Sequence, residues 1–235
     1  PAALAQNDWA ALQKGGSVAL DANKYWLGEP LLKMSISDAE KCGFDNPGLA
    51  TCLGELGRLY TIRRRYSEAE PLLERELAVR EMILGKQDGK IVSSMGSLIT
   101  FYLNYGTIDK AEPLTDDMLA FLEGKMQESH ARPDAKRAKG APLEGWCGDA
   151  PPRMVIPLMD WAVTCDSVGN AYRCRGKYEL AEKLFKASLD MKTTILGKGH
   201  LSLAHTFDHL GCLYLEKKDY AEAESYFRES VLATM

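Results

Sequence analysis

The sequence lacks the short motifs by which many enzymes are recognised. It has no G-x-S-x-G nucleophile elbow and no H-E-x-x-H zinc motif. Gly15-Gly16-Ser17 lacks both the preceding strand and the spacing that a phosphate-binding loop requires. Carboxylate pairs such as Asp116-Asp117 fall at solvated helical positions, where nothing gives the two groups contrasting environments. We therefore expect no catalytic residues, and the sequence argues against an enzyme.

Excess charge and long apolar runs are also missing. The formal net charge is −4 over 235 residues, which favours neither nucleic acid nor a membrane surface as a partner. No stretch reaches the roughly 18 apolar residues that a bilayer span needs. We expect no nucleic-acid partner and no membrane span. Pro1 to Gln6 fits both the end of an export signal and the start of a helix, so a cytoplasmic and an exported location both stay open.

Cysteine and histidine are present without a metal-binding pattern. The six cysteines show no CxxC pair, and we interpret most of them as structural thiols. Cys42 and Cys52 flank one loop and form the first pair to test for a disulfide. His205 and His209 are four residues apart on one predicted helix, so both could reach one ion. Histidines that line a groove or cap a helix are the favoured interpretation, and we expect no metal and no cofactor.

The sequence does contain a repeated pair of motifs. A Gly-x-x-Tyr segment is followed by Ala-Glu, and the step between successive alanines is 42 residues from Ala69 to Ala111 and again from Ala181 to Ala223. A fixed period of this size indicates stacked repeats, whose extended surfaces bind other chains. The copies are Leu56-Gly57-x-x-Tyr60 with Ala69-Glu70, Val168-Gly169-x-x-Tyr172 with Ala181-Glu182, Leu210-Gly211-x-x-Tyr214 with Ala223-Glu224, and the degenerate Leu98-Ile99-x-x-Tyr102 with Ala111-Glu112.

Each repeat is predicted to form two helices, because apolar residues recur at three- and four-residue steps on both sides of the Tyr. Ser67-x-x-Glu70 predicts a capping box at the start of a second helix. Gly85 and Gly197 are expected to end second helices in the left-handed conformation. The small residues of the motif should let the two helices approach closely. The large residues Leu73, Phe185 and Phe227 should fill the space between stacked units.

The pattern resembles the tetratricopeptide repeat, whose signature is W-x₂-L-G-x₂-Y followed by A-x₃-F. Leu210-Gly211-x-x-Tyr214 with Ala223-x-x-x-Phe227 carries the match. The 42-residue period and the segment Leu196-Gly197-Lys198-Gly199-His200 are similar to the kinesin light chain and nephrocystin-like branch, which has an LG-x-x-H linker between repeats. The resemblance implies an all-α fold, a right-handed superhelical solenoid of antiparallel helix pairs.

One repeat domain is predicted to span 1–235. Its units are expected at about 3–44, 47–88, 89–130, 154–198 and 200–235, and the first preserves only its second helix clearly. The step from Ala111 to Ala181 is 70 residues, so an irregular insertion rich in Pro and Gly is placed at about 131–153. The insertion is either a functional arm or a passive extension.

The resemblance also implies where a partner binds, because in this family the first helix of each pair faces the concave groove. Asn, Arg and His side chains there can hydrogen-bond an extended peptide. We predict a non-catalytic scaffold that binds a peptide or a partner helix. The alternatives are an assembly element that forms a homo-oligomer and, more remotely, a metal-dependent activity at His205 and His209. Positions counted from the Tyr give the groove candidates Glu55, Arg58, Thr61, Thr100, Asn104, Asp166, Asn170, Arg173, His205 and His209.

Overall fold

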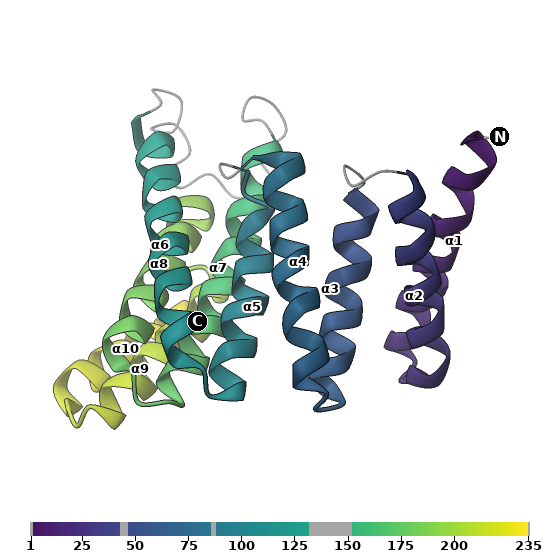
Figure 1. Ribbon diagram of the computed structural model, residues 1–235. Helices are drawn as coiled ribbons and strands as arrows, with labels where there is room; N and C mark the ends of the chain where they lie inside the picture. The colour runs from purple at the N-terminus through teal and green to yellow at the C-terminus, as the bar shows by residue number, and fades with distance from the viewer. Residues whose placement is uncertain (1, 43–46, 86–87, 132–151, 235) are drawn as a thin grey trace. The chain divides into compact units, whose positions relative to one another are not determined.

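The computed structural model describes the backbone of residues 2–42, 47–85, 88–131 and 152–234, and side chains within 9–41, 48–85, 88–127 and 158–234. These residues form ten α-helices and one 3₁₀ turn, and none of them lies in a strand, which confirms the all-α prediction (Figure 1). The elements are α1 (Ala2–Asp21), α2 (Tyr25–Cys42), α3 (Pro47–Ile62), α4 (Tyr66–Leu84), α5 (Ile91–Tyr105), α6 (Ile108–Ala131), α7 (Pro152–Arg173), α8 (Tyr178–Leu196), η3 (Leu201–Leu203), α9 (Ala204–Glu216) and α10 (Tyr220–Thr234). The predicted insertion at 131–153 lies almost entirely outside the described residues.

The chain divides into two compact units, Pro1–Phe101 and Tyr102–Met235. In the first unit α1 packs on α2, α3 packs on α4, and α2 also contacts α3. In the second unit α7 packs on α8, α9 packs on α10, and α8 also contacts α9. The second helix of one pair therefore packs against the first helix of the next pair within each unit. A single repeat domain over 1–235 stays a prediction.

Glycine on the first helix lets the two helices of a pair approach closely. A Cβ atom on Gly57 would lie 2.8 Å from Leu73 Cδ2, and one on Gly169 would lie 2.8 Å from Phe185 Cε1. The large side chain of the second helix thus lies directly on the glycine of its own pair. The prediction placed these side chains in the space between stacked units, and Leu73 and Phe185 also contact the glycine of their own pair. Phe185 serves both contacts, because its ring also lies 5.2 Å from that of His209 in the next pair.

The first pair uses the same contact although its sequence is degenerate. A Cβ atom on Gly16 of α1 would lie 2.8 Å from Leu32 Cδ2 of α2. Gly16 and Leu32 are 16 residues apart, as are Gly57 and Leu73. Ala19 occupies the place that Tyr60 has in the second pair. The expectation that only the second helix of this unit is clearly preserved overlooks α1. The motif in α1 keeps its Gly at Gly16 but has Ala19 in place of the Tyr.

All five helix pairs close with the same turn. The residue four positions after the Tyr, or after Ala19, has a positive φ in every pair: Asn23, Arg64, Gly106, Gly176 and Lys218. The next N–H donates back to the carbonyl of the Tyr, as from Arg65 to Tyr60 at 2.8 Å and from Lys177 to Tyr172 at 3.1 Å. This closure lets the second helix begin directly after a turn of two to four residues.

The capping box predicted at Ser67-x-x-Glu70 is wrong. The α4 helix begins at Tyr66 after Arg65, which makes no side-chain capping bond, because the shared turn leads straight into the helix and leaves Ser67 in its first turn. Gly85 ends α4 with φ 77° and ψ 151°. That φ is positive as predicted, but the ψ places Gly85 in an extended region open essentially to glycine alone.

The linkers after α4 and α8 are each held by a side chain that caps the next helix. His200 Nδ1 accepts a hydrogen bond from the Ser202 N–H at 3.1 Å at the start of η3. At the equivalent place Asp88 Oδ1 accepts one from the Lys90 N–H at 2.9 Å. Asp88 and His200 each follow a helix-ending glycine by three residues. The histidine of the LG-x-x-H linker is therefore a cap, and Asp88 replaces it in the second repeat.

Candidate functional site

The candidate site consists of the exposed sides of the first helices, which we call the first-helix faces. In the first unit α1 contacts α3, and in the second unit α7 contacts α9. Neighbouring first helices thus form one continuous face within each unit. Each of the ten predicted residues lies on a first helix, but their surroundings differ.

On the face of the first unit, one candidate is bound by a neighbouring helix. Ser17 of α1 donates to both carboxylate oxygens of Glu55, at 2.7 and 2.8 Å. Burial raises the pKa of Glu55, although the bonds from Ser17 and the charge of Arg58 oppose it. Arg58 is exposed, whereas Thr61 donates to the Gly57 carbonyl at 2.9 Å and is half-buried. Thr100 of α5 is also half-buried. Arg58 is therefore the predicted residue most available to a ligand on this face.

On the face of the second unit, three polar side chains form a chain from α7 to α9. Arg173 donates through Nε and Nη2 to Asn170 Oδ1, at 3.2 and 2.8 Å. Its Nη1 pairs with the Glu216 carboxylate of α9. His205 is exposed on α9. In α5 the Asn104 side chain is exposed, and its backbone carbonyl accepts a bond from Arg175 at 3.1 Å.

His209 lies half-buried beside this chain. Its ring packs against Phe185, and its Nδ1 atom is buried without a hydrogen-bond partner in the described part of the chain. Burial lowers the pKa of His209, and the charges of Arg173, Lys192 and His205 lower it further, against the opposing effect of Asp166. The imidazole is therefore neutral at physiological pH and can serve as a polar, uncharged contact.

Asp166 is the one predicted residue that lies inside the protein. It is buried, and its Oδ2 accepts a hydrogen bond from Lys192 Nζ at 2.5 Å. The same Nζ donates to Thr206 Oγ1 at 2.7 Å, which joins α8 to α9. Lys192 and Thr206 are buried as well. We call Asp166, Lys192 and Thr206 the buried ionic cluster. It stabilises the junction between two pairs and offers no surface to a ligand.

The first unit builds a similar cluster with the acid on the other helix. Glu76 of α4 is buried and accepts bonds from Ser94 at 2.9 Å and from Arg80 at 3.1 Å. Arg80 and Lys192 hold the same repeat position, eleven residues after the motif Ala, and Ser94 and Thr206 both lie eight residues before a Tyr. Gly54 occupies the position of Asp166, and a Cβ there would lie 2.4 Å from the Glu76 carboxylate. The cation and the hydroxyl thus occupy the same repeat positions in both units. The acid lies on the second helix in the first unit and on the first helix in the second unit.

A second junction contact uses the Glu of the Ala-Glu motif, which sequence reasoning treated only as a repeat marker. Glu182 of α8 accepts hydrogen bonds from Tyr214 at 2.8 Å, Lys217 at 2.8 Å and Lys186 at 2.6 Å. Burial raises the pKa of Glu182, but these three bonds outweigh it and hold the pKa at about 2. The available signal was the recurrence of Glu after Ala, with a Tyr and a cation in the next repeat.

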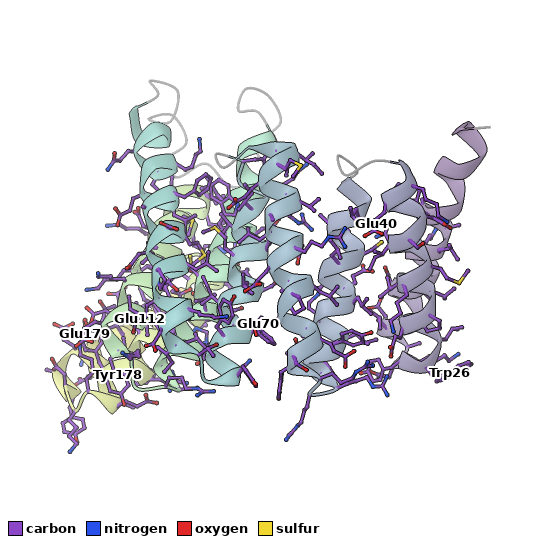
Figure 2. The ribbon with its side chains drawn as sticks, in the orientation of Figure 1. Trp26, Glu40, Glu70, Glu112, Tyr178 and Glu179 are labelled. Atoms are coloured by element: carbon purple, nitrogen blue, oxygen red, sulfur yellow. The ribbon has the colours of Figure 1, made fainter. Side chains whose placement is uncertain are left out.

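Glu29 of α2 makes the equivalent junction in the first unit. It accepts hydrogen bonds from Tyr60 at 3.0 Å and from Lys33 at 2.9 Å. Arg63 and Arg65 add ion pairs at 2.8 and 3.1 Å. Burial raises the pKa of Glu29, yet its hydrogen bonds bring the pKa to about 2. Two of the three consecutive arginines at this turn therefore bind within the unit. In the second unit Glu112, labelled in Figure 2, pairs with Lys177 at 2.8 Å.

Replacing Glu182 with Gln should change how stability depends on pH. The folded pKa of about 2 lies below the ordinary value of 4.5, so the contribution of this carboxylate is present above pH 4.5 and is lost as the pH falls toward 2. We expect Glu182→Gln to lower the free energy of unfolding by about 1 kcal/mol at pH 7 and by nearly nothing at pH 2. Urea unfolding across this pH range measures the difference. A deficit of equal size at both ends would contradict the assignment.

Cysteines and histidines do not assemble a metal site in the described part of the chain. No three His, Cys, Asp or Glu side chains lie together there as metal ligands would. Cys52, Cys165, Cys174 and Cys212 are free thiols. Cys52 lies 3.2 Å from Ser35 Oγ, and burial raises the pKa of the Cys165 thiol to about 12. The Cys42 side chain and Cys147 lie outside the described residues.

No described helix is long and apolar enough for a bilayer span.

Comparison with known proteins agrees with this geometry. Models of the tetratricopeptide repeat match residues 49–88 and 163–231. No curated protein sequence matches the chain. Among solved structures, BtubC (BKLC) from P. vanneervenii is similar over 99% of this chain and 89% of its own, with 13% identity and a TM-score of 0.66. Kinesin light chain TPR-like repeats from Podospora anserina are similar over 96% of this chain and 94% of their own, with 17% identity and a TM-score of 0.64. At these identities the likeness shows the fold.

Proposed function

Because the chain carries tetratricopeptide repeats, we propose that it is a non-catalytic scaffold that binds a peptide or a helix of another protein on its first-helix faces. The observation that carries the proposal is the polar chain of Asn170, Arg173 and Glu216 across α7 and α9. These side chains project from helices, whose backbone N–H and C=O groups already hydrogen-bond to one another. The ligand therefore meets side chains and not open backbone.

The first-helix faces are surfaces that exist before a ligand binds. Helix packing fixes the positions of Arg58 in one unit and of Asn170 and Arg173 in the other, so the ordering cost of binding falls mainly on the ligand. Asn supplies both a donor and an acceptor for a peptide unit, and the guanidinium supplies donors to carbonyl or carboxylate oxygens. A ligand carboxylate would replace Glu216 as a partner of Arg173.

Exposed apolar side chains supply the second part of such a surface. Val163 of α7 is 55% exposed, and Leu215 of α9 is 44% exposed. Val163 lies seven residues before Asn170, so the two share one side of the helix. Ile62 at the end of α3 is 63% exposed in the first unit. Apolar contacts beside fixed polar groups favour a ligand that has alternating polar and apolar side chains.

A peptide selection tests the binding face. Random peptides displayed on phage are selected against the chain, and their affinity is then measured for the Asn170→Ala/Arg173→Ala variant. We expect binding to the second unit to weaken about tenfold or more, since one lost charged hydrogen bond costs about 1.5–3 kcal/mol. The unfolding midpoint should fall only slightly, because the two half-buried side chains bond mainly to each other and to Glu216.

The matched control places two alanines on a second helix instead. Glu179 and Lys183 are exposed on α8, and Glu179→Ala/Lys183→Ala should leave peptide affinity unchanged. Selected peptides that bind the face variant as tightly as the parent chain, and lose affinity in the control, would overturn the assignment of the face.

A further inference from the structure

His209 lies where two helix pairs of the second unit meet. The centroid of its ring lies 5.2 Å from that of Phe185 on α8, and Phe185 is fully buried. The Nδ1 atom of His209 is buried and has no hydrogen-bond partner among the described residues. With its proton on Nε2, a neutral imidazole places a bare nitrogen there, whereas an imidazolium would place an N–H donor without an acceptor.

The position of His209, five residues before the motif Tyr, is satisfied differently in three other pairs. Glu55 accepts two hydrogen bonds from Ser17. Ser97 and Ser167 each donate to the backbone carbonyl four residues earlier, at 3.0 Å. Stacking of helix pairs therefore does not require a histidine at this position. The imidazole adds a property that these three side chains lack, because its charge changes near neutral pH.

Charged groups on the helices around His209 disfavour a further positive charge. Burial lowers the pKa of His209 most, and Arg173 of α7, Lys192 of α8 and His205 of α9 lower it further. Asp166 of α7 raises that pKa, but its carboxylate is already paired with Lys192. A proton on His209 therefore enters a partly buried site that is surrounded by cations and whose nearby carboxylate is occupied.

The α9 helix connects His209 to the polar chain on the first-helix face. Glu216 follows His209 by seven residues, so at about 100° per residue the two lie on the same side of α9. Glu216 pairs with Arg173 of α7, and Arg173 donates to Asn170. One side of α9 thus carries both the aromatic contact to α8 and the ionic contact to α7, and a shift of this helix disturbs both.

We propose that His209 is an acid-sensitive switch at the junction of α8 and α9. At neutral pH the uncharged ring packs on Phe185 and closes the junction. When His209 takes up a proton, its half-buried ring leaves Phe185 for solvent, and α9 with α10 loosens from α7 and α8. The ion pair between Arg173 and Glu216 opens with this movement. The switch is a property of the fold and does not depend on the proposed peptide binding.

The direction of the pH dependence follows from proton binding. The pKa of His209 in the folded chain lies below its ordinary value of 6.5, so between these two values the opened junction binds more protons than the closed one. The closed junction is therefore fully stable above pH 6.5 and loses stability as the pH falls toward the folded pKa. Glu182 loses its contribution only below pH 4.5, which separates the two effects.

Two NMR measurements test the switch. The Cε1–H signal of His209, assigned by triple resonance, should titrate with a midpoint below 6.5. Amide hydrogen exchange, corrected for the intrinsic rate at each pH, should show that α9 loses about threefold to tenfold in protection between about pH 7.5 and 5. The α4 helix is the internal reference, because the first unit, Pro1–Phe101, contains no histidine.

Two variants separate His209 from the other histidines. His209→Gln keeps a polar side chain that takes up no proton, so α9 should keep its protection over the same pH range. His205→Gln removes an exposed histidine of the same helix and should leave the acid loss in place. A His209 midpoint at or above 6.5 would overturn the proposal, and so would equal losses in the parent chain and in His209→Gln. If His209→Gln does not fold, the titration midpoint and the exchange of the parent chain decide the question.

Discussion

Replacing Lys192 with Met is expected to lower the free energy of unfolding by about 3–5 kcal/mol. Lys192 is buried, and its ammonium group holds Asp166 and Thr206 together at the junction of α7, α8 and α9. Methionine retains the length and the apolar stem but removes the charge. The Asp166 carboxylate then stays buried with the Thr206 hydroxyl as its remaining hydrogen-bond donor in the buried ionic cluster. Urea denaturation followed by circular dichroism measures the loss.

The double variant separates the cost of an unpaired charge from the value of the ion pair. Lys192→Met/Asp166→Leu removes both charges, and we expect it to recover most of the lost stability, because an apolar replacement of a buried pair is often neutral. Lys183→Met, at an exposed position of the same helix, should change stability by less than about 0.5 kcal/mol. A double variant as unstable as the single one would show that the defect is packing and not charge.

The helix pairs could be predicted because their signals are local. Gly57 and Leu73, or Gly169 and Phe185, are separated by 16 residues, so the contact between them lies within one hairpin. The same spacing in Gly16 and Leu32 would have revealed α1 without its Tyr. The turns are local as well. The residue four positions after the Tyr has a positive φ even where it is Arg64 or Lys218 and not glycine. Repetition makes local geometry readable from sequence.

The candidate site was less predictable, because contacts with the neighbouring helix pair determine whether each of its residues is exposed or buried. Counting positions along one helix predicts that Asp166 lies on the exposed side. Its partners lie 26 and 40 residues further along the chain, at Lys192 and Thr206. In the first unit the acid of the similar cluster is Glu76, on the second helix, and Gly54 takes the place of Asp166. No count on a single helix distinguishes these two arrangements.

The same limit explains why some candidates are exposed and others are bound. Arg58 and His205 lie at the surface, as positions on a first-helix face would. Glu55 is bound by Ser17, 38 residues earlier, and Arg173 is bound by Glu216, 43 residues later. Both separations are close to one repeat period. Partners of this kind lie near, but not exactly at, one repeat period, because neighbouring first helices contact each other within each unit.

Replacing Gly169 with Leu is the other substitution with a large expected effect, and the cost should depend on whether the opposing ring can move. A Cβ on Gly169 would lie 2.8 Å from Phe185, whose side chain is fully buried and also contacts His209. A Cβ on Gly211 would lie 2.7 Å from Phe227, which is half-buried and can turn toward solvent. Overpacking of a closed core costs about 1–3 kcal/mol and sometimes more.

We therefore expect Gly169→Leu to lower the free energy of unfolding by about 3 kcal/mol and Gly211→Leu by about 1 kcal/mol. If Gly169→Leu does not fold, Gly169→Ala and Gly211→Ala give the same comparison with a single added methyl group. Urea unfolding of the four variants measures the order. Equal losses at the two glycines would mean that the helix backbones, and not the two aromatic rings, absorb the added volume.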